Sequence, residues 1–191
     1  MAYYYLMAQL PYLVFEQKPP MSSAAFKDLC TYQLTEADNA LMAELSLTQD
    51  KDLSVKTGCS FIDEWREWDY CFTVNLAKQR AIKLKSDPNS IKETADIHLD
   101  ILSLIAKAMD ELSPLEGETI IDKARWIAIE SFTGSEYFDR NHVYAYYLKL
   151  LLLERRQFFD TEKGFAEYKS LYASIVESGQ ESRGELINDR N

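Results

Sequence analysis

The chain has few of the residues from which small-molecule active sites are usually built. Its 191 residues include only 6 Gly and 2 His, and the glycines are scattered singly. Phosphate-binding loops need clustered glycines, and the sequence has neither Gly-x-x-x-x-Gly-Lys nor Gly-x-Gly-x-x-Gly. It also lacks the Gly-x-Ser-x-Gly turn of α/β-hydrolase nucleophiles. Nucleotide binding is therefore disfavoured, and we expect a protein that is not an enzyme and has no catalytic residues, metal or cofactor.

Cysteines and long apolar runs are scarce as well. Cys30, Cys59 and Cys71 are odd in number and too far apart for a Cys-x-x-Cys pair. This usage favours buried reduced thiols in the cytosol over a disulfide framework. The N-terminus lacks the basic flank and apolar core of a signal peptide, and no run approaches the roughly 18 apolar residues of a spanning helix. We expect a cytoplasmic protein that is neither exported nor embedded in a membrane.

Basic residues are in the minority, with 21 against 31 acidic residues and a formal net charge of −10. Such a balance repels phosphate backbones, which argues against nucleic-acid or anionic-lipid binding. One stretch departs from this average, because four basic residues follow one another without an intervening acid: Lys78, Arg80, Lys83 and Lys85. A solvated helix face with bases near its C-terminus is the simpler interpretation. A partner-binding site is the alternative.

The sequence does have strong helical periodicity. Few Gly and Pro and abundant Leu, Ala, Glu and Lys favour helices over strands. The strongest segment spans residues 138–159, where apolar residues form two adjoining stripes: Val143, Tyr147 and Leu150, and Tyr144, Leu148 and Leu151. An apolar arc wider than about 100° indicates a helix with several neighbours. We predict an all-α, multi-helix bundle around a central helix near residues 138–159.

Capping residues mark other helix starts. Candidate first residues are Ser22 or Ser23, Thr35, Pro114, and Ser135 or Asp139. The run Thr35-Glu36-Ala37-Asp38 has the form of a capping box with Asp in place of Glu. Apolar spacing predicts a further helix from Ile91 to Leu112. We predict one helical domain over residues 1–178, with a candidate internal boundary near 48–60 and a flexible tail over 179–191.

Two aromatic groups have alternative interpretations. Phe61, Trp65, Trp68 and Phe72 recur at helical spacing on a helix that extends to Lys85. Such a stripe is more commonly core, and a ligand pocket is the alternative. Three tyrosines lie near the N-terminus: Tyr3, Tyr4 and Tyr5. Docking of this end into the core is the favoured interpretation, and contact with a partner is the alternative.

The two histidines leave few metal sites. Di-metal helical bundles use two Glu-x-x-His pairs with further carboxylates. Asp139-x-x-His142 is a single imperfect copy of this motif, and Ala95 takes the acidic place before His98. A hydrogen-bonded pair of Asp139 with His142, and a core position for His98, are the simpler interpretations. A carboxylate-metal enzyme using Asp139 and His142 is our third functional hypothesis.

Three stretches resemble an uncharacterised bacterial family whose genes lie among those of V-type ATPase subunits: Tyr3-Tyr4-Tyr5-Leu6-Met7-Ala8-Gln9-Leu10-Pro11; Asn75-Leu76-Ala77-Lys78-Gln79-Arg80-Ala81; and Tyr146-Tyr147-Leu148-Lys149-Leu150 with Glu154-Arg155-Arg156. Its members look like shortened relatives or functional stand-ins of the subunit called C in archaeal-type enzymes and d in eukaryotic ones. That subunit is an all-helical adaptor without catalytic residues, which seats the central shaft on the membrane proteolipid ring.

The resemblance implies a non-catalytic rotor adaptor in the cytoplasm, with the shaft subunits and the proteolipid ring as partners. Membrane contact would be peripheral at the inner membrane, through the ring only. The candidate partner-binding residues are Tyr3, Tyr4, Tyr5, Lys78, Arg80, Lys83 and Lys85. The alternative function is a stand-alone helical binding or regulatory module with an aromatic pocket around Trp65 and Trp68.

Overall fold

A computed structural model describes residues 2–47, 55–88, 91, 99–159, 165, 168–172 and 174–175. All regular secondary structure in these residues is helical, which confirms the predicted all-α class. The helices are α1 (Tyr4–Gln9), α2 (Ser23–Thr31), α3 (Glu36–Ala43), α4 (Ser60–Lys83), α5 (Leu99–Asp110), α6 (Pro114–Phe132) and α7 (Arg140–Gln157).

The chain divides into two compact units, Met1–Arg156 and Gln157–Asn191. We predicted one domain over 1–178, whereas this division falls after Arg156. The described apolar side chains of the second unit are exposed: Phe158, Phe159, Phe165, Tyr168, Leu171, Tyr172 and Ile175. Residues 48–54 and 179–191 lie outside the described part, so the internal boundary near 48–60 and the flexible tail stay predictions.

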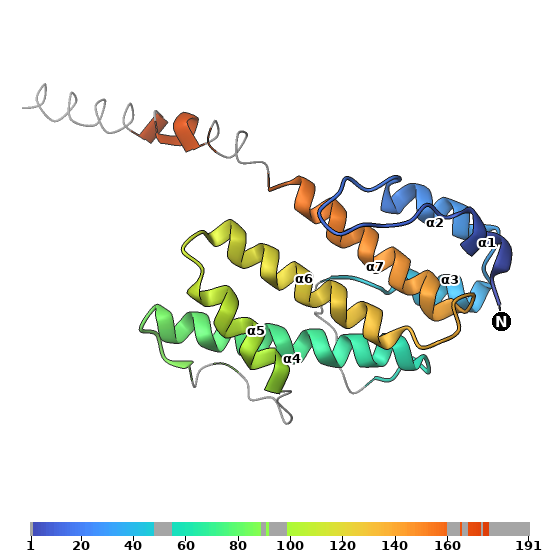
Figure 1. Ribbon diagram of the computed structural model, residues 1–191, viewed down its shortest axis with the longest axis horizontal. Coiled ribbons are helices and arrows are strands. Elements are labelled where there is room, and N and C mark those ends of the chain that lie inside the picture. The colour runs from blue at the N-terminus through green and yellow to red at the C-terminus, as the bar shows by residue number, and fades with distance from the viewer. Residues whose placement is uncertain are drawn as a thin grey trace, which may run out of the picture. The chain divides into compact units, whose positions relative to one another are not determined.

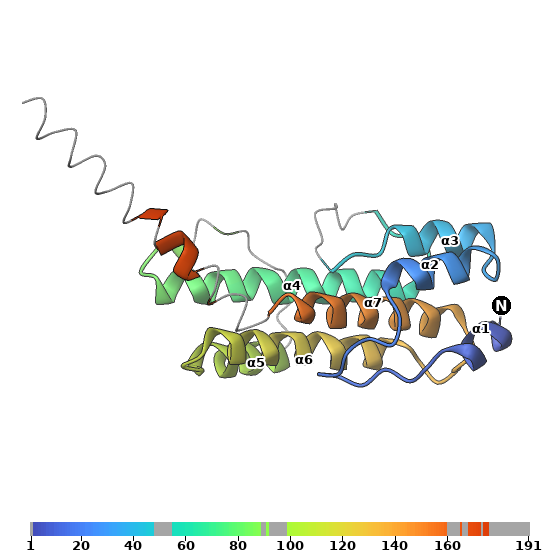
Figure 2. The ribbon, with the colours of Figure 1, turned by 90° about the horizontal axis from the view of Figure 1, so that it is seen from above.

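Within Met1–Arg156 the long helices α4, α6 and α7 run side by side (Figures 1 and 2). Helix α6 is antiparallel to the other two. The short helices α1, α2 and α3 surround one end of α7, and α5 packs on α4 and α6 toward the other end. One apolar cluster gathers around α7 and the N-terminal helices, and a second lies between α4, α5 and α6. Trp68 packs against both clusters.

Helix α7 is the predicted central helix. Every residue at positions 143–148 is buried, and so are Leu150, Leu152 and Leu153. Phe61 of α4 and Phe26 of α2 contact its tyrosines from different sides, with ring centroids 6.4 Å from Tyr144 and 5.0 Å from Tyr146. Leu151, which we placed in the apolar arc, is only half-buried.

The helix starts follow the predicted caps. Ser22 Oγ accepts from Ala25 N at 3.1 Å and Thr35 Oγ1 accepts from Asp38 N at 3.2 Å. Asp139 Oδ1 accepts from His142 N at 3.1 Å at the start of α7. Pro114 occupies the first turn of α6. The predicted helix from Ile91 to Leu112 is described only as α5, because residues 92–98, His98 among them, lie outside the described part.

The aromatic stripe of α4 belongs to the core, as favoured. Trp65 and Phe72 are fully buried. Trp68 stacks between them, with ring centroids 5.9 Å from Trp65 and 5.0 Å from Phe72. The rings therefore pack against one another inside the first unit. None of the described helices is both long enough and apolar enough to cross a bilayer.

Candidate functional site

The three N-terminal tyrosines have different surroundings. Tyr3 is buried, its hydroxyl donates to the Asp38 carboxylate, and its backbone N–H donates to Phe138 O at 2.6 Å. Tyr3 is thus a core residue, which corrects its prediction as a partner-binding residue and supports the docking interpretation for this position. Tyr4 and Tyr5 are exposed. Only these two tyrosines of the predicted set can reach a partner.

Asp38 is the centre of a buried polar cluster. Its carboxylate accepts from Tyr3, from Tyr144 Oη at 3.3 Å and from Arg140 Nη1 at 3.4 Å. Burial alone would raise the pKa of this carboxyl, but hydrogen bonds from Tyr3, Thr35, Tyr144 and Arg140 outweigh burial and hold the pKa below its ordinary value. The cluster ties the N-terminal segment, α3 and α7 together.

The Asp38→Asn variant tests this cluster through its pH dependence. Because the pKa of Asp38 is lower in the folded chain than in the unfolded chain, its charged form stabilises the fold above the ordinary carboxyl pKa of about 4, and this stability is lost as pH falls through the folded value. We expect the variant to be less stable by about 1.5 to 3 kcal/mol at pH 7, with a smaller deficit below about pH 4. Thermal unfolding followed by circular dichroism measures it; a deficit that is constant with pH contradicts the prediction.

A pocket of about 300 Å³ is lined by the N-terminal segment, by the C-terminal end of α6 with the residues after it, and by the N-terminal half of α7. Its apolar lining comes from Met7, Leu10, Pro11, Leu13 and Ala145. Its polar and aromatic lining comes from Tyr12, Glu130, Thr133, Tyr137, His142, Tyr146 and Lys149. The Tyr146 hydroxyl donates to Pro11 O at 2.9 Å and so fixes the N-terminal segment against α7.

The charged groups of the pocket already have partners. Lys149 Nζ donates to Glu130 Oε1 at 2.8 Å, and Trp126 Nε1 donates to the same oxygen at 3.0 Å. His142 Nδ1 lies 3.3 Å from Asp139 Oδ1, which is the predicted local pair. Among the described residues no three His, Cys, Asp or Glu side chains are placed to hold a metal ion. The pocket thus has an apolar part and a polar part, and the charges of Lys149 and Glu130 in its polar part offset each other.

Exposed aromatic rings line this pocket or contact its lining: Tyr12 and Tyr137 line it, and Phe138 contacts Tyr137. The ring of Tyr4 lies 4.8 Å from Phe138, that of Phe138 lies 5.2 Å from Tyr137, and that of Tyr137 lies 5.1 Å from His142. We call Tyr4, Tyr12, Tyr137 and Phe138 the aromatic patch; their exposed fractions are 60%, 86%, 54% and 38%. Sequence reasoning identified only Tyr4 of this patch, because the fold brings the other three to it.

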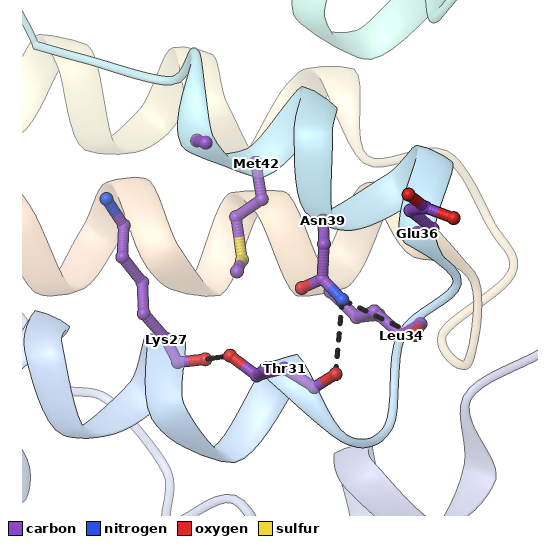
Figure 3. Close-up of a pocket in the computed structure, with 7 residues that line it drawn as sticks. Lys27, Thr31, Leu34, Glu36, Asn39 and Met42 are labelled. Atoms are coloured by element: carbon purple, nitrogen blue, oxygen red, sulfur yellow. Dashed lines mark hydrogen bonds between the residues drawn. The ribbon is translucent and has the colours of Figure 1, made fainter.

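A second pocket of about 430 Å³ lies between α2 and α3 (Figure 3). Lys27, Thr31 and Leu34 line one side, and Asn39 and Met42 line the other. Asn39 Nδ2 donates to the carbonyl oxygens of Thr31 and Leu34 at 3.4 Å, and Thr31 Oγ1 donates to Lys27 O at 3.0 Å. These side chains therefore bind the local backbone and join the two helices.

The four basic residues predicted as a group near the end of α4 have different surroundings. Arg80 Nη2 pairs with Glu118 at 2.7 Å, and Lys83 Nζ donates to Met109 O at 2.6 Å. Lys78 is half-buried and Lys85 is exposed. The contacts of Arg80 and Lys83 bring the carboxylate of Glu118 in α6 and a backbone carbonyl of α5 to this end of α4. Two of the four bases, Arg80 and Lys83, therefore have partners within the fold, and a partner-binding role for this group stays a prediction.

A buried ion network, which sequence reasoning missed, joins α4, α6 and α7. Arg125 Nε donates to Asp69 Oδ1 at 3.0 Å, and Arg125 Nη1 lies 3.6 Å from Asp122 Oδ1. Arg155 bridges Asp122 at 2.6 Å and Glu118 at 2.7 Å. Burial raises the pKa of Asp69 and of Asp122, although the neighbouring arginines lower it. The signal in the sequence was a charged residue within an apolar stripe, since Asp69 lies between Trp65 and Phe72.

The run Glu154-Arg155-Arg156 contacts three different parts of the fold. The Glu154 carboxylate accepts from Ser23 N at 2.7 Å and Ser23 Oγ at 2.6 Å, at the N-terminus of α2. The Arg156 guanidinium lies 4.8 Å from the ring centroid of Phe15. With Arg155 in the ion network, this run holds the end of α7 to α2, α6 and the N-terminal segment.

Residues 97–178 match the model of a family described as a protein of unknown function, DUF2764. The match spans α5, α6 and α7, and so includes Asp122, Arg125, Tyr137 and Phe138. Helix α4 and the N-terminal segment precede it. No curated protein and no solved structure matches the chain. Residues 97–178 are therefore similar to a family whose description states no activity.

Proposed function

We propose that the protein is a non-catalytic adaptor of a V-type ATPase, which joins the central shaft to the membrane proteolipid ring. The observation that carries the adaptor role is the aromatic patch on a rigidly packed end of the helical unit. Exposed aromatic side chains in contact with one another are typical of protein–protein interfaces. The resemblance of the three stretches to proteins encoded among V-type ATPase genes supports the choice of complex.

The packing of these stretches also supports the proposal. The first and third stretches meet where Tyr146 donates to Pro11 O. The third stretch continues into Glu154-Arg155-Arg156, and Arg155 joins Arg80 of the second stretch through their shared partner Glu118. An adaptor that transmits torque needs helices that do not slide against one another, and the buried pair of Arg125 in α6 with Asp69 in α4 would oppose such sliding. The adaptor would work in the cytoplasm and reach the inner membrane only through the ring.

Deletion and reconstitution test this function. We expect that removing the protein separates the shaft from the ring and uncouples proton pumping from ATP hydrolysis, and that adding it back restores both. The measurements are co-purification of shaft and ring subunits and proton uptake by reconstituted vesicles. A complex that stays assembled and coupled without the protein overturns the proposal.

A stand-alone binding module is the second candidate, and the 300 Å³ pocket is the observation that favours it. Its place differs from the one expected, because Trp65 is buried in the core and Trp68 stacks on it. The same deletion separates the two candidates. An adaptor co-purifies with shaft or ring subunits in stoichiometric amounts, whereas a stand-alone module does not.

A further inference from the structure

We propose that the aromatic patch and its pocket bind a basic segment of a partner polypeptide, which inserts one large apolar side chain into the pocket. This inference rests on the proposed function only in requiring a protein partner. It adds the chemistry of that partner: an apolar anchor flanked by arginine or lysine. The site combines three features that together select such a segment, namely exposed rings, an apolar cavity and an acidic segment, residues 136–139, that carries two of the rings.

The exposed rings provide the binding surface. Tyr4, Phe138 and Tyr137 contact in series, and Tyr12 lines the pocket together with Tyr137. Tyrosine is enriched among interface residues that contribute most to affinity, because it offers a large rigid contact area. Rings that contact one another while exposed gain further burial when a partner covers them.

The pocket provides the place for an anchor. A volume of about 300 Å³ is at the lower end of ligand-binding pockets and suits one large side chain. Met7, Leu10 and Leu13 give it an apolar lining. Hydrogen bonding of Tyr146 to Pro11 O holds the segment that carries these residues. An apolar side chain entering here would leave the pairing of Lys149 with Glu130 intact.

The charges around the patch select a basic partner. Glu136 and Asp139 flank Tyr137 and Phe138 in the segment between α6 and α7, whereas Glu130 is already paired with Lys149. The nearby cations are already opposite acids, since Lys149 pairs with Glu130 and Arg140 contacts Asp38. The faces of exposed tyrosine rings attract cations as well. Arginine or lysine beside the anchor would therefore meet carboxylates and ring faces, while a phosphate-rich surface would be repelled.

Short synthetic peptides test the proposal on the full chain. The probe has one phenylalanine flanked by arginines in a glycine–serine background; one control replaces phenylalanine by serine and another replaces the arginines by glutamates. We expect the probe to bind and to shift the backbone NMR signals of Tyr137 and Ala145. Each control should bind at least about tenfold more weakly. Equal binding of all three peptides, or shifts confined to other parts of the chain, overturns the proposal.

Variants of exposed tyrosines remove the surface without touching the core. Tyr12→Ala and Tyr137→Ala should each weaken binding of the probe at least about fivefold. The matched control is Tyr32→Ala, since Tyr32 is 91% exposed after α2 and belongs to neither the patch nor the pocket. Unchanged thermal unfolding shows that the variants are folded. Equal weakening by Tyr32→Ala indicates non-specific attraction of a cationic peptide and overturns the assignment.

The same variants can also reveal two other ligands of the aromatic patch. Binding of phosphatidylglycerol vesicles that Tyr137→Ala abolishes would replace the polypeptide by a lipid surface. A concentration-dependent dimer that Tyr137→Ala dissolves would replace it by a second copy. Failure of the inference is also distinct from failure of the proposed function. If the peptides do not bind but shaft and ring still depend on the protein for assembly, only this inference is contradicted. If the probe binds but shaft and ring assemble without the protein, only the ATPase assignment is contradicted.

Discussion

Replacing Arg125 by methionine is expected to lower the free energy of unfolding by about 3 to 5 kcal/mol, because buried carboxylates lose their cation. Arg125 lies 3.0 Å from Asp69 and 3.6 Å from Asp122, and both carboxylates are almost completely buried. Arg155 still contacts Asp122 in the variant, so Asp69 bears most of the loss. Urea denaturation at pH 7 measures the difference. A loss of less than about 1 kcal/mol would show that the pair acts like an exposed one.

A double-mutant cycle identifies the cause of the loss. If Arg125→Met destabilises the fold by leaving Asp69 charged and unpaired, adding Asp69→Asn should restore part of the stability. The pH dependence has a definite sign as well. Burial already raises the pKa of Asp69, and Arg125 opposes that rise. Without Arg125 the folded pKa is higher still, so the deficit of Arg125→Met should shrink as pH falls and Asp69 takes up its proton.

An exposed ion pair serves as the matched control for this variant. Lys56 Nζ lies 3.6 Å from Glu67, and both side chains are mostly exposed. Lys56→Met removes a cation and its pairing, as Arg125→Met does, but leaves a carboxylate that water can solvate. We expect a change of no more than about 0.5 kcal/mol. A comparable loss in both variants would mean that burial of the network is not the reason for its effect.

Local signals in the sequence predicted the helices and their caps well. Ser22 and Thr35 accept backbone N–H groups as expected, because capping depends only on residues a few positions apart. The capping box shows the limit of such reasoning. Asp38 was assigned to close it, yet its carboxylate turns to Tyr3 and Tyr144. These partners are remote in sequence, and local spacing carries no information about them.

The candidate site was predicted only in part for the same reason. Docking of the N-terminal tyrosines into the core was the favoured interpretation, and the fold does bury Tyr3. No signal in the sequence indicated that Tyr4 would join Tyr137 and Phe138, which precede α7. The basic residues at the end of α4 were predicted as a group because no acidic residue lies between them in the sequence. Arg80 pairs with Glu118 of α6, so the net charge around these bases also depends on residues of a neighbouring helix.

Helix α7 contributes both to the stability of the first unit and to the proposed binding pocket. Helix α7 carries His142 and Tyr146 into the pocket from one end, and Arg155 into the ion network from the other. Displacement of this helix would therefore change the pocket and the network together. The stability of α7 in its apolar surroundings is the property on which both depend.

Truncating Leu148 in the middle of α7 should show this dependence directly. Leu148 is fully buried in the apolar cluster around α7. Leu148→Ala removes buried methyl groups and leaves a cavity that surrounding helices fill only in part, so we expect a loss of about 2 to 5 kcal/mol in the free energy of unfolding. Urea denaturation followed by circular dichroism measures the loss. The same variant should also bind the phenylalanine–arginine probe more weakly at temperatures where part of the population is unfolded.

Two further leucine-to-alanine changes make the test independent of the substitution itself. Leu151 is only half-buried against the same cluster, so Leu151→Ala should cost less than Leu148→Ala. Leu112 is 100% exposed in the turn between α5 and α6, and its truncation should change stability by no more than about 0.5 kcal/mol. The expected order follows burial alone, because all three variants lose the same atoms. Equal losses at Leu148 and Leu112, or little loss at Leu148, would refute α7 as the central helix of the bundle.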